Sequence, residues 1–146
     1  MKILVIYDSV YGNTEKIAKA IGAAMAGEVR VARVGEADAS GLAGVELLVV
    51  GSPTLGGRPT QPIQDLLASL PETDLKGIKV AAFDTRYDGR FVKLFGFAAE
   101  KISASLTAKG GKLTSPPQPY IVTGKTGPLK GGELDRAASW AKEISK

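Results

Sequence analysis

The sequence predicts an α/β domain built on a doubly wound, five-stranded parallel sheet with helices on both faces. Two observations lead to this fold class. Short and nearly continuous apolar runs, which are typical of buried parallel strands, alternate with longer segments whose apolar residues recur at helical spacing. No linker, repeat or low-complexity tract interrupts this alternation along the 146 residues, so we expect one domain covering residues 1–146.

Five segments have the composition of strands. Residues 2–8, 45–51 and 78–84 are nearly continuous apolar runs, as expected of strands in the middle of a parallel sheet. Residues 28–34 alternate valine with arginine, which predicts a half-exposed strand at an edge. A shorter apolar run at 120–123 supplies the fifth strand.

Four segments have helical spacing. One begins near Glu15, one follows Pro62, one covers Phe91–Lys109 and ends at Gly110, and the last covers residues 134–144. In the last helix the predicted apolar face consists of Leu134, Ala137, Ala138, Ala141 and Ile144. Trp140 lies on or beside this face and is expected in the core, and residues 35–44 are expected to hold only a short helix.

The turn between the first strand and the first helix, Ser9–Thr14, is the most informative motif. Free N–H groups at a helix N-terminus lie at the positive end of the helix dipole, where an anion binds favourably. Gly12 allows a ligand to approach the backbone, and Ser9, Asn13 and Thr14 add short donors. The turn therefore predicts a phosphate site, although taken alone it equally allows Asn13 or Thr14 to act only as a helix cap.

Two further polar, glycine-bearing loops follow the third and fourth predicted strands, at residues 52–61 and 84–90. In a doubly wound sheet, ligands bind beyond the carboxyl ends of the strands, where the strand order reverses. All three loops are expected at this edge. Together they predict a site that encloses a flat ring attached to a phosphate.

Composition excludes several kinds of chemistry. The chain has no cysteine and no histidine, so thiolate catalysis, a Ser-His-Asp triad and Cys/His zinc sites are excluded, and redox work would require an organic cofactor. No apolar run approaches the roughly 18 residues of a membrane helix, and Met1-Lys2 leads directly into a strand, so no membrane insertion and a cytoplasmic location are expected.

The charge of the chain is unevenly placed. Residues 1–85 hold 8 Lys or Arg against 10 Asp or Glu, whereas residues 86–146 hold 11 against 5. Such a basic half fits a solvated surface, an acidic protein or a nucleotide phosphate. Because no dense Arg/Lys cluster is interleaved with aromatic residues, nucleic acid is not an expected partner.

Taken together, these features resemble those of the short-chain flavodoxins and flavodoxin-like FMN-binding proteins, and the resemblance covers essentially the whole chain. The phosphate loop of that family is [ST]-x-T-G-x-T, which Ser9, Gly12 and Thr14 match, with Tyr11 in place of the usual threonine. The resemblance implies a flavodoxin-like sheet of order 2-1-3-4-5, FMN as the cofactor and no metal. It also implies that the Gly56-Gly57 peptide reorients when the flavin is reduced.

The resemblance implies cofactor contacts from the three loops and no catalytic side chain. The implied FMN-binding residues are Ser9, Val10, Tyr11, Gly12, Asn13, Thr14, Pro53, Thr54, Leu55, Gly56, Gly57, Asp84, Thr85, Arg86 and Tyr87. Tyr87 is the expected stacking residue, because Leu55 stands where many flavodoxins carry an aromatic residue.

Three functions follow as hypotheses. The first is a flavodoxin-type electron carrier, an electron-transfer flavoprotein that serves a redox partner protein. The second is an FMN-dependent NAD(P)H:quinone oxidoreductase, in which Arg58, Arg86 and Arg90 would attract the dinucleotide; the Ser-x-Tyr-Gly sequence is familiar in such proteins. The third, a receiver-like signalling domain, is disfavoured because the third strand ends at Val50-Gly51-Ser52 without a phosphoacceptor aspartate.

Overall fold

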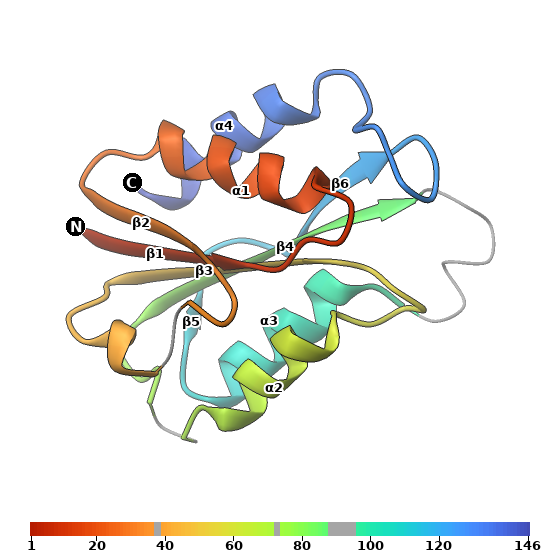
Figure 1. Ribbon diagram of the computed structural model, residues 1–146. Helices are drawn as coiled ribbons and strands as arrows, with labels where there is room; N and C mark the ends of the chain where they lie inside the picture. The colour runs from red at the N-terminus through yellow and green to blue at the C-terminus, as the bar shows by residue number, and fades with distance from the viewer. Residues whose placement is uncertain (37–38, 72–73, 88–95) are drawn as a thin grey trace.

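The computed structural model describes residues 1–36, 39–71, 74–87 and 96–146, and shows a sheet between two layers of helices (Figure 1). The strands are β1 (Lys2–Tyr7), β2 (Glu28–Arg33), β3 (Leu47–Pro53), β4 (Lys79–Tyr87), β5 (Lys112–Leu113) and β6 (Gln118–Val122). The helices are α1 (Asn13–Ala24), α2 (Gln61–Ser69), α3 (Ala98–Ala108) and α4 (Glu133–Ile144), with the expected short helix, η1, at Ala39–Leu42. No helix among the described residues is long and apolar enough to cross a membrane.

Every strand pair in the sheet is parallel, and the order β2-β1-β3-β4 continues with β5 and β6, which both pair with β4. The predicted order is confirmed, with β6 as the expected fifth strand and β2 at the opposite edge. The edge beside β4 is divided, because β5 pairs with residues 79–80 and β6 with residues 83–87. The two-residue β5 escapes prediction because it is too short to carry a periodic pattern.

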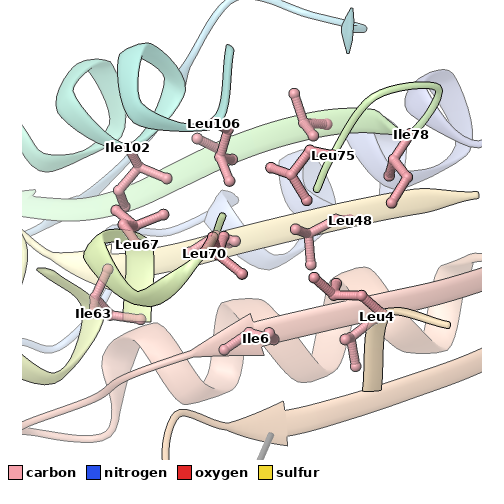
Figure 2. Packing of buried hydrophobic residues seen from close by; sticks show 14 of the residues in the cluster. Leu4, Ile6, Leu48, Ile63, Leu67, Leu70, Leu75, Ile78, Ile102 and Leu106 are labelled. Carbon is pink, nitrogen blue, oxygen red and sulfur yellow. The ribbon is translucent and has the colours of Figure 1, made fainter. Parts of the chain in front are cut away.

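Two hydrophobic clusters hold the helices on the sheet. One lies between the sheet and the α2–α3 layer, and its central side chains include Leu4, Ile6, Leu48, Ile63, Leu67, Ile102 and Leu106 (Figure 2). The other lies beneath α1 and α4 and includes Ile3, Val5, Ile17, Ile21, Phe83 and Trp140. Because successive side chains of a strand point to opposite faces, β1 and β3 supply both clusters, which explains their continuously apolar sequences.

Trp140 is a core residue, as predicted, with 4% of its surface exposed. Its ring packs edge-on against Phe83 and Tyr120, with ring centroids 6.3 and 6.4 Å away. The indole Nε1 donates a hydrogen bond to Ser115 Oγ (2.9 Å), in the segment between β5 and β6. The last helix is thereby fixed over the edge of the sheet beside β4.

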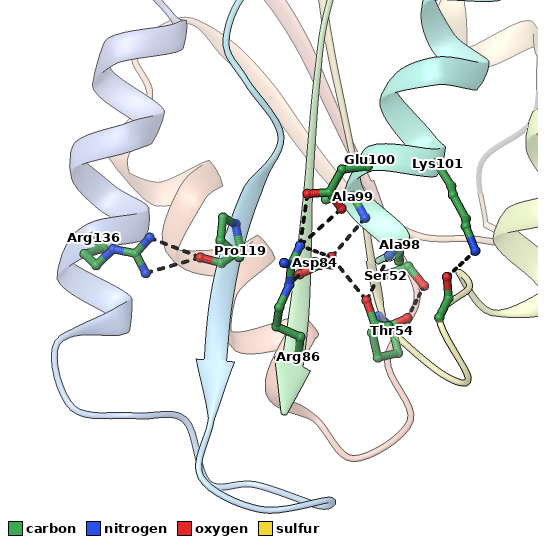
Figure 3. Close-up of polar contacts among 12 residues, drawn as sticks. Ser52, Thr54, Asp84, Arg86, Ala98, Ala99, Glu100, Lys101, Pro119 and Arg136 are labelled. Atoms are coloured by element: carbon green, nitrogen blue, oxygen red, sulfur yellow. Dashed lines mark hydrogen bonds and ion pairs between the residues drawn. The ribbon is translucent and has the colours of Figure 1, made fainter. Parts of the chain in front are cut away.

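The outer side of β6 bonds to α4 and to the segment before it. The Ile121 N–H donates to Glu133 Oε2 (2.7 Å), and the Ile121 carbonyl accepts from the Lys130 N–H (2.8 Å). The Arg136 guanidinium donates twice to the Pro119 carbonyl (3.2 and 3.1 Å; Figure 3). Glu133 is consequently buried although it lies on a surface helix.

Two details of the helix predictions are wrong. The helix predicted from Phe91 begins at Ala98, since Gly96 has φ +80° and Phe97 is extended; residues 91–95 lie outside the described residues. Leu134, predicted on the apolar face of the last helix, is 46% exposed. Glu133 takes the buried position next to it because its carboxylate bonds the outer side of β6.

Candidate functional site

A cleft of about 320 Å³ opens where the turn after β1, the loop after β3, the end of β4 and the segment after β6 converge. This volume lies within the roughly 300–1,000 Å³ of small-molecule sites, and the carboxyl edge of a doubly wound sheet is where such sites form. Ten of the predicted cofactor-binding residues line the cleft: Val10, Tyr11, Asn13, Thr14, Pro53, Thr54, Leu55, Gly56, Thr85 and Tyr87.

The turn after β1 leaves the first amides of α1 open. Gly12 is the N-cap residue, with φ +92°, a conformation that a residue with Cβ seldom adopts, and no side chain caps the helix. Ser9 Oγ closes the turn by accepting from the Gly12 N–H (3.0 Å). Thr14 Oγ1 lies 2.6 Å from Thr85 Oγ1, so Thr14 does not serve as the helix cap. The exposed helix end suits an anion.

Side chains from two distant segments brace this turn. Arg33, at the end of β2, donates from Nη1 to the Ser9 carbonyl (3.0 Å) and to Asp8 Oδ1 (3.1 Å). On the other side, Asn13 Nδ2 donates to the Thr126 carbonyl (3.1 Å) in the loop before α4. The structure thus holds the turn in shape through contacts within the protein.

The loop after β3 contains a tight turn at residues 55–58, called the glycine turn below. The Leu55 N–H donates to the Arg58 carbonyl (2.8 Å) and the Arg58 N–H to the Leu55 carbonyl (3.1 Å). Gly56 and Gly57 have φ +57° and +80°, the two positive values that a type I′ turn requires. Gly56 lines the cleft, whereas the Gly57 carbonyl accepts from Lys101 Nζ of α3 (2.6 Å).

Strand β4 runs to Tyr87, so residues 84–87 belong to the strand and not to the predicted loop. Alternate side chains of a strand point to opposite faces. Thr85 and Tyr87 accordingly line the cleft, while Asp84 and Arg86 contact α3. The rest of that predicted loop, residues 88–90, lies outside the described residues.

Asp84 is fully buried and accepts four hydrogen bonds (Figure 3). Arg86 donates two, from Nε (2.8 Å) and Nη2 (2.7 Å), the Ala99 N–H donates one (2.9 Å), and Thr54 Oγ1 donates one (3.1 Å). Thr54 Oγ1 also accepts from the Ala98 N–H (2.9 Å). Burial raises the pKa of the Asp84 carboxyl, and the Arg86 guanidinium opposes that rise. The carboxylate joins β4, the loop after β3 and the start of α3.

The guanidinium of Arg86 also makes its contacts away from the cleft. Its Nη2 lies 3.3 Å from Glu100 Oε2, and its guanidinium carbon lies 3.5 Å from the centre of the Phe97 ring, a cation–π contact. The predicted site residues that do not line the cleft are Ser9, Gly12, Gly57, Asp84 and Arg86.

Large apolar side chains are exposed around the cleft. Val10, Tyr11, Leu55 and Tyr87 all line it and are 43–56% exposed. Elsewhere in the described residues, the exposed large apolar side chains are only Met1, Leu113 and Leu134, at 38–46%. Because apolar surface in contact with water is unfavourable, a flat apolar ring in the cleft would be stabilised by covering these side chains.

Val122 and Lys125 also line the cleft, although the sequence did not predict them there. Val122 pairs in register with Tyr87, so the pairing of β6 with β4 brings it to the site. Lys125 precedes Thr126, whose carbonyl bonds Asn13. Neither residue carries a local motif, and only the order of the strands could have indicated Val122.

Comparison with known proteins gives a family match over nearly the whole chain. The family model described as flavodoxin matches residues 5–142. A search of curated proteins gave no match.

Solved structures of flavodoxins have the same fold along nearly the whole chain. Oxidised flavodoxin 2 from Bacillus cereus is 25% identical, with a TM-score of 0.84, 99% of this chain covered and 98% of that chain. Oxidised flavodoxin 1 from Bacillus cereus is 20% identical, with a TM-score of 0.83 and coverage of 99% and 97%. A short-chain flavodoxin associated with a non-canonical PDU bacterial microcompartment is 16% identical, with a TM-score of 0.80 and coverage of 99% and 97%.

Proposed function

The chain belongs to the flavodoxin family and is an FMN-binding electron carrier, and we propose that the cleft at the carboxyl edge of its sheet is the FMN site. The observation that carries this assignment is the pairing, within one cleft, of an uncapped helix N-terminus with a group of exposed apolar side chains. FMN has the matching chemistry, since it joins one phosphate to a flat ring.

The residues present fit this cofactor. The first amides of α1 and the Thr14 hydroxyl, which line the cleft, would hold the phosphate through charge-assisted hydrogen bonds. The Ser9 hydroxyl, whose oxygen accepts from the Gly12 N–H, would donate its own hydrogen to the phosphate from the adjoining turn. Leu55 and Tyr87 would cover the ring, and Gly56 would bring the backbone close to it. When bound, the flavin supplies the electron-transfer chemistry, and this chain binds it, orients it and adjusts its potentials by stacking, backbone dipoles and nearby charge.

An electron carrier of this family exchanges electrons with redox partner proteins. The comparisons do not favour the alternative, an NAD(P)H:quinone oxidoreductase. Of the arginines considered for it, Arg86 is bonded to Asp84 and Glu100, and Arg90 lies outside the described residues. We propose that the partner is a protein that docks at the cleft mouth, over Tyr11, Leu55 and Tyr87.

Titration of the flavin-free protein with FMN, followed by quenching of flavin fluorescence, tests this assignment. We expect one FMN per chain, weaker binding of riboflavin because it lacks the phosphate, and no binding of FAD because the cleft offers one phosphate site. A protein that takes up no FMN would contradict the proposal, and so would equal affinity for FMN and riboflavin.

A further inference from the structure

The glycine turn is contacted by a lysine that does not line the cleft. Lys101, in the first turn of α3, donates from Nζ to the Gly57 carbonyl at 2.6 Å (Figure 3). Gly57 itself is buried, whereas its neighbour Gly56 is exposed and lines the cleft. Lys101 therefore bonds the glycine that does not line the proposed FMN site, directly beside the glycine that does.

The hydrogen bonds of the turn differ among its three peptide groups. The first peptide, between Leu55 and Gly56, is fixed because its carbonyl accepts from the Arg58 N–H. The third peptide, between Gly57 and Arg58, is fixed at both ends, because its carbonyl accepts from Lys101 and its N–H donates to the Leu55 carbonyl. In the middle peptide, neither the Gly56 carbonyl nor the Gly57 N–H has a hydrogen-bond partner within the described part of the chain. With glycine on both sides, rotation of this peptide meets little steric resistance.

We propose that Lys101 is a positioning residue for the bound flavin, because it holds the Gly57 carbonyl and so confines reorientation of the turn to the Gly56–Gly57 peptide beside the cleft. This inference rests on the proposed function. Without Lys101, the third peptide can move together with the middle one, and the contact offered to the flavin is less well defined. The consequence is a change in the relative stability of the flavin's redox states.

The chain provides a matched control in Lys109. Both lysines line the same groove between α2 and α3, and Lys109 Nζ donates to the Leu70 carbonyl at the same distance, 2.6 Å. Lys109 lies eight positions after Lys101, which places it about 12 Å further along the helix direction, away from the glycine turn. Lys101→Met and Lys109→Met therefore remove the same charge and the same kind of bond at different places.

Potentiometric titration of the FMN-loaded variants is the test. For Lys101→Met, we expect the midpoint potential of the first one-electron reduction of the flavin to fall by about 59 mV relative to that of the second reduction. This shift is a tenfold change in the ratio of the equilibrium constants of the two reduction steps. The oxidised protein should bind FMN within about threefold of wild type. The shift should persist at 1 M salt, where the Debye length is about 3 Å, because it arises from a direct bond. For Lys109→Met, we expect less than a twofold change in the ratio.

Equal shifts for the two variants, or a Lys101→Met shift abolished at 1 M salt, would show that only long-range charge acts and would overturn the inference. Amide hydrogen exchange of the flavin-free protein gives an independent measurement. Exchange at Arg58 should accelerate in Lys101→Met and not in Lys109→Met, and unchanged exchange would also overturn it. Failure of the wild type to bind FMN refutes the proposed function, whereas FMN binding with unchanged potentials in Lys101→Met refutes this inference alone.

Discussion

Replacing Asp84 by alanine should destabilise the flavin-free protein more than any exposed substitution near the cleft. The carboxylate has no exposed surface and accepts hydrogen bonds from Arg86, Ala99 and Thr54. Removing one partner of a buried ion pair costs about 3–5 kcal/mol, since the other charge stays buried and unpaired. For a domain whose unfolding free energy is about 5–15 kcal/mol, this loss is large. It corresponds to a fall in melting temperature of roughly 6–20 °C.

Urea unfolding of Asp84→Ala, Arg86→Met and the double variant measures the effect and its origin. Because most of the cost comes from a guanidinium left with only the exposed Glu100 carboxylate as its charge partner, the double variant should be more stable than the sum of the two single losses predicts, by about 2 kcal/mol or more. Glu100→Gln is the control, because Glu100 contacts the same arginine from a 52%-exposed position and should contribute less than about 1 kcal/mol. A loss below 1 kcal/mol in Asp84→Ala, or strict additivity in the cycle, would refute the reasoning.

Two further predictions concern the turn after β1 and the packing beneath the cleft. Ser9→Ala and Thr14→Val should each weaken FMN binding about ten- to a hundredfold, as expected for loss of a hydroxyl bonded to a charged phosphate. Binding of riboflavin, which has no phosphate, should change little. Equal losses of affinity for both ligands in a fluorescence titration would mean that these residues only shape the turn. Gly51→Ala should lower the free energy of unfolding in urea by about 1–3 kcal/mol, because the new Cβ would overlap the Phe83 ring, and an unchanged midpoint would show that the ring moves aside freely.

The sheet was predictable from sequence because its central strands are buried on both sides. Residues 47–51 read as an unbroken apolar run, so local composition and final environment agree. Helix α4 was less predictable in detail. Leu134 fits the helical pattern, but the neighbouring Glu133 is buried by its bond to the Ile121 N–H, a contact between segments that periodicity cannot reveal.

The position of the candidate cleft was predictable in outline for a related reason. Glycine positions such as Gly12 carry a local conformational signal, since φ +92° there favours glycine whatever the rest of the chain does. The direction of side chains along β4 depends instead on where the strand ends. Because β4 extends through Tyr87, alternation places Arg86 against Phe97 and Glu100 and leaves Thr85 in the cleft.

The bonds along the outer side of β6 bear on how this protein behaves at high concentration. An edge strand with free N–H and carbonyl groups is a template for another chain and hence a starting point for aggregation. Here the outward groups of Pro119 and Ile121 are already bonded to Arg136, Glu133 and the Lys130 backbone. At the opposite edge, β2 carries Arg30 and Arg33, whose charges oppose pairing with a like strand. The outer sides of β6 and β2 thus discourage the addition of a foreign strand, which favours a carrier that stays dispersed between encounters.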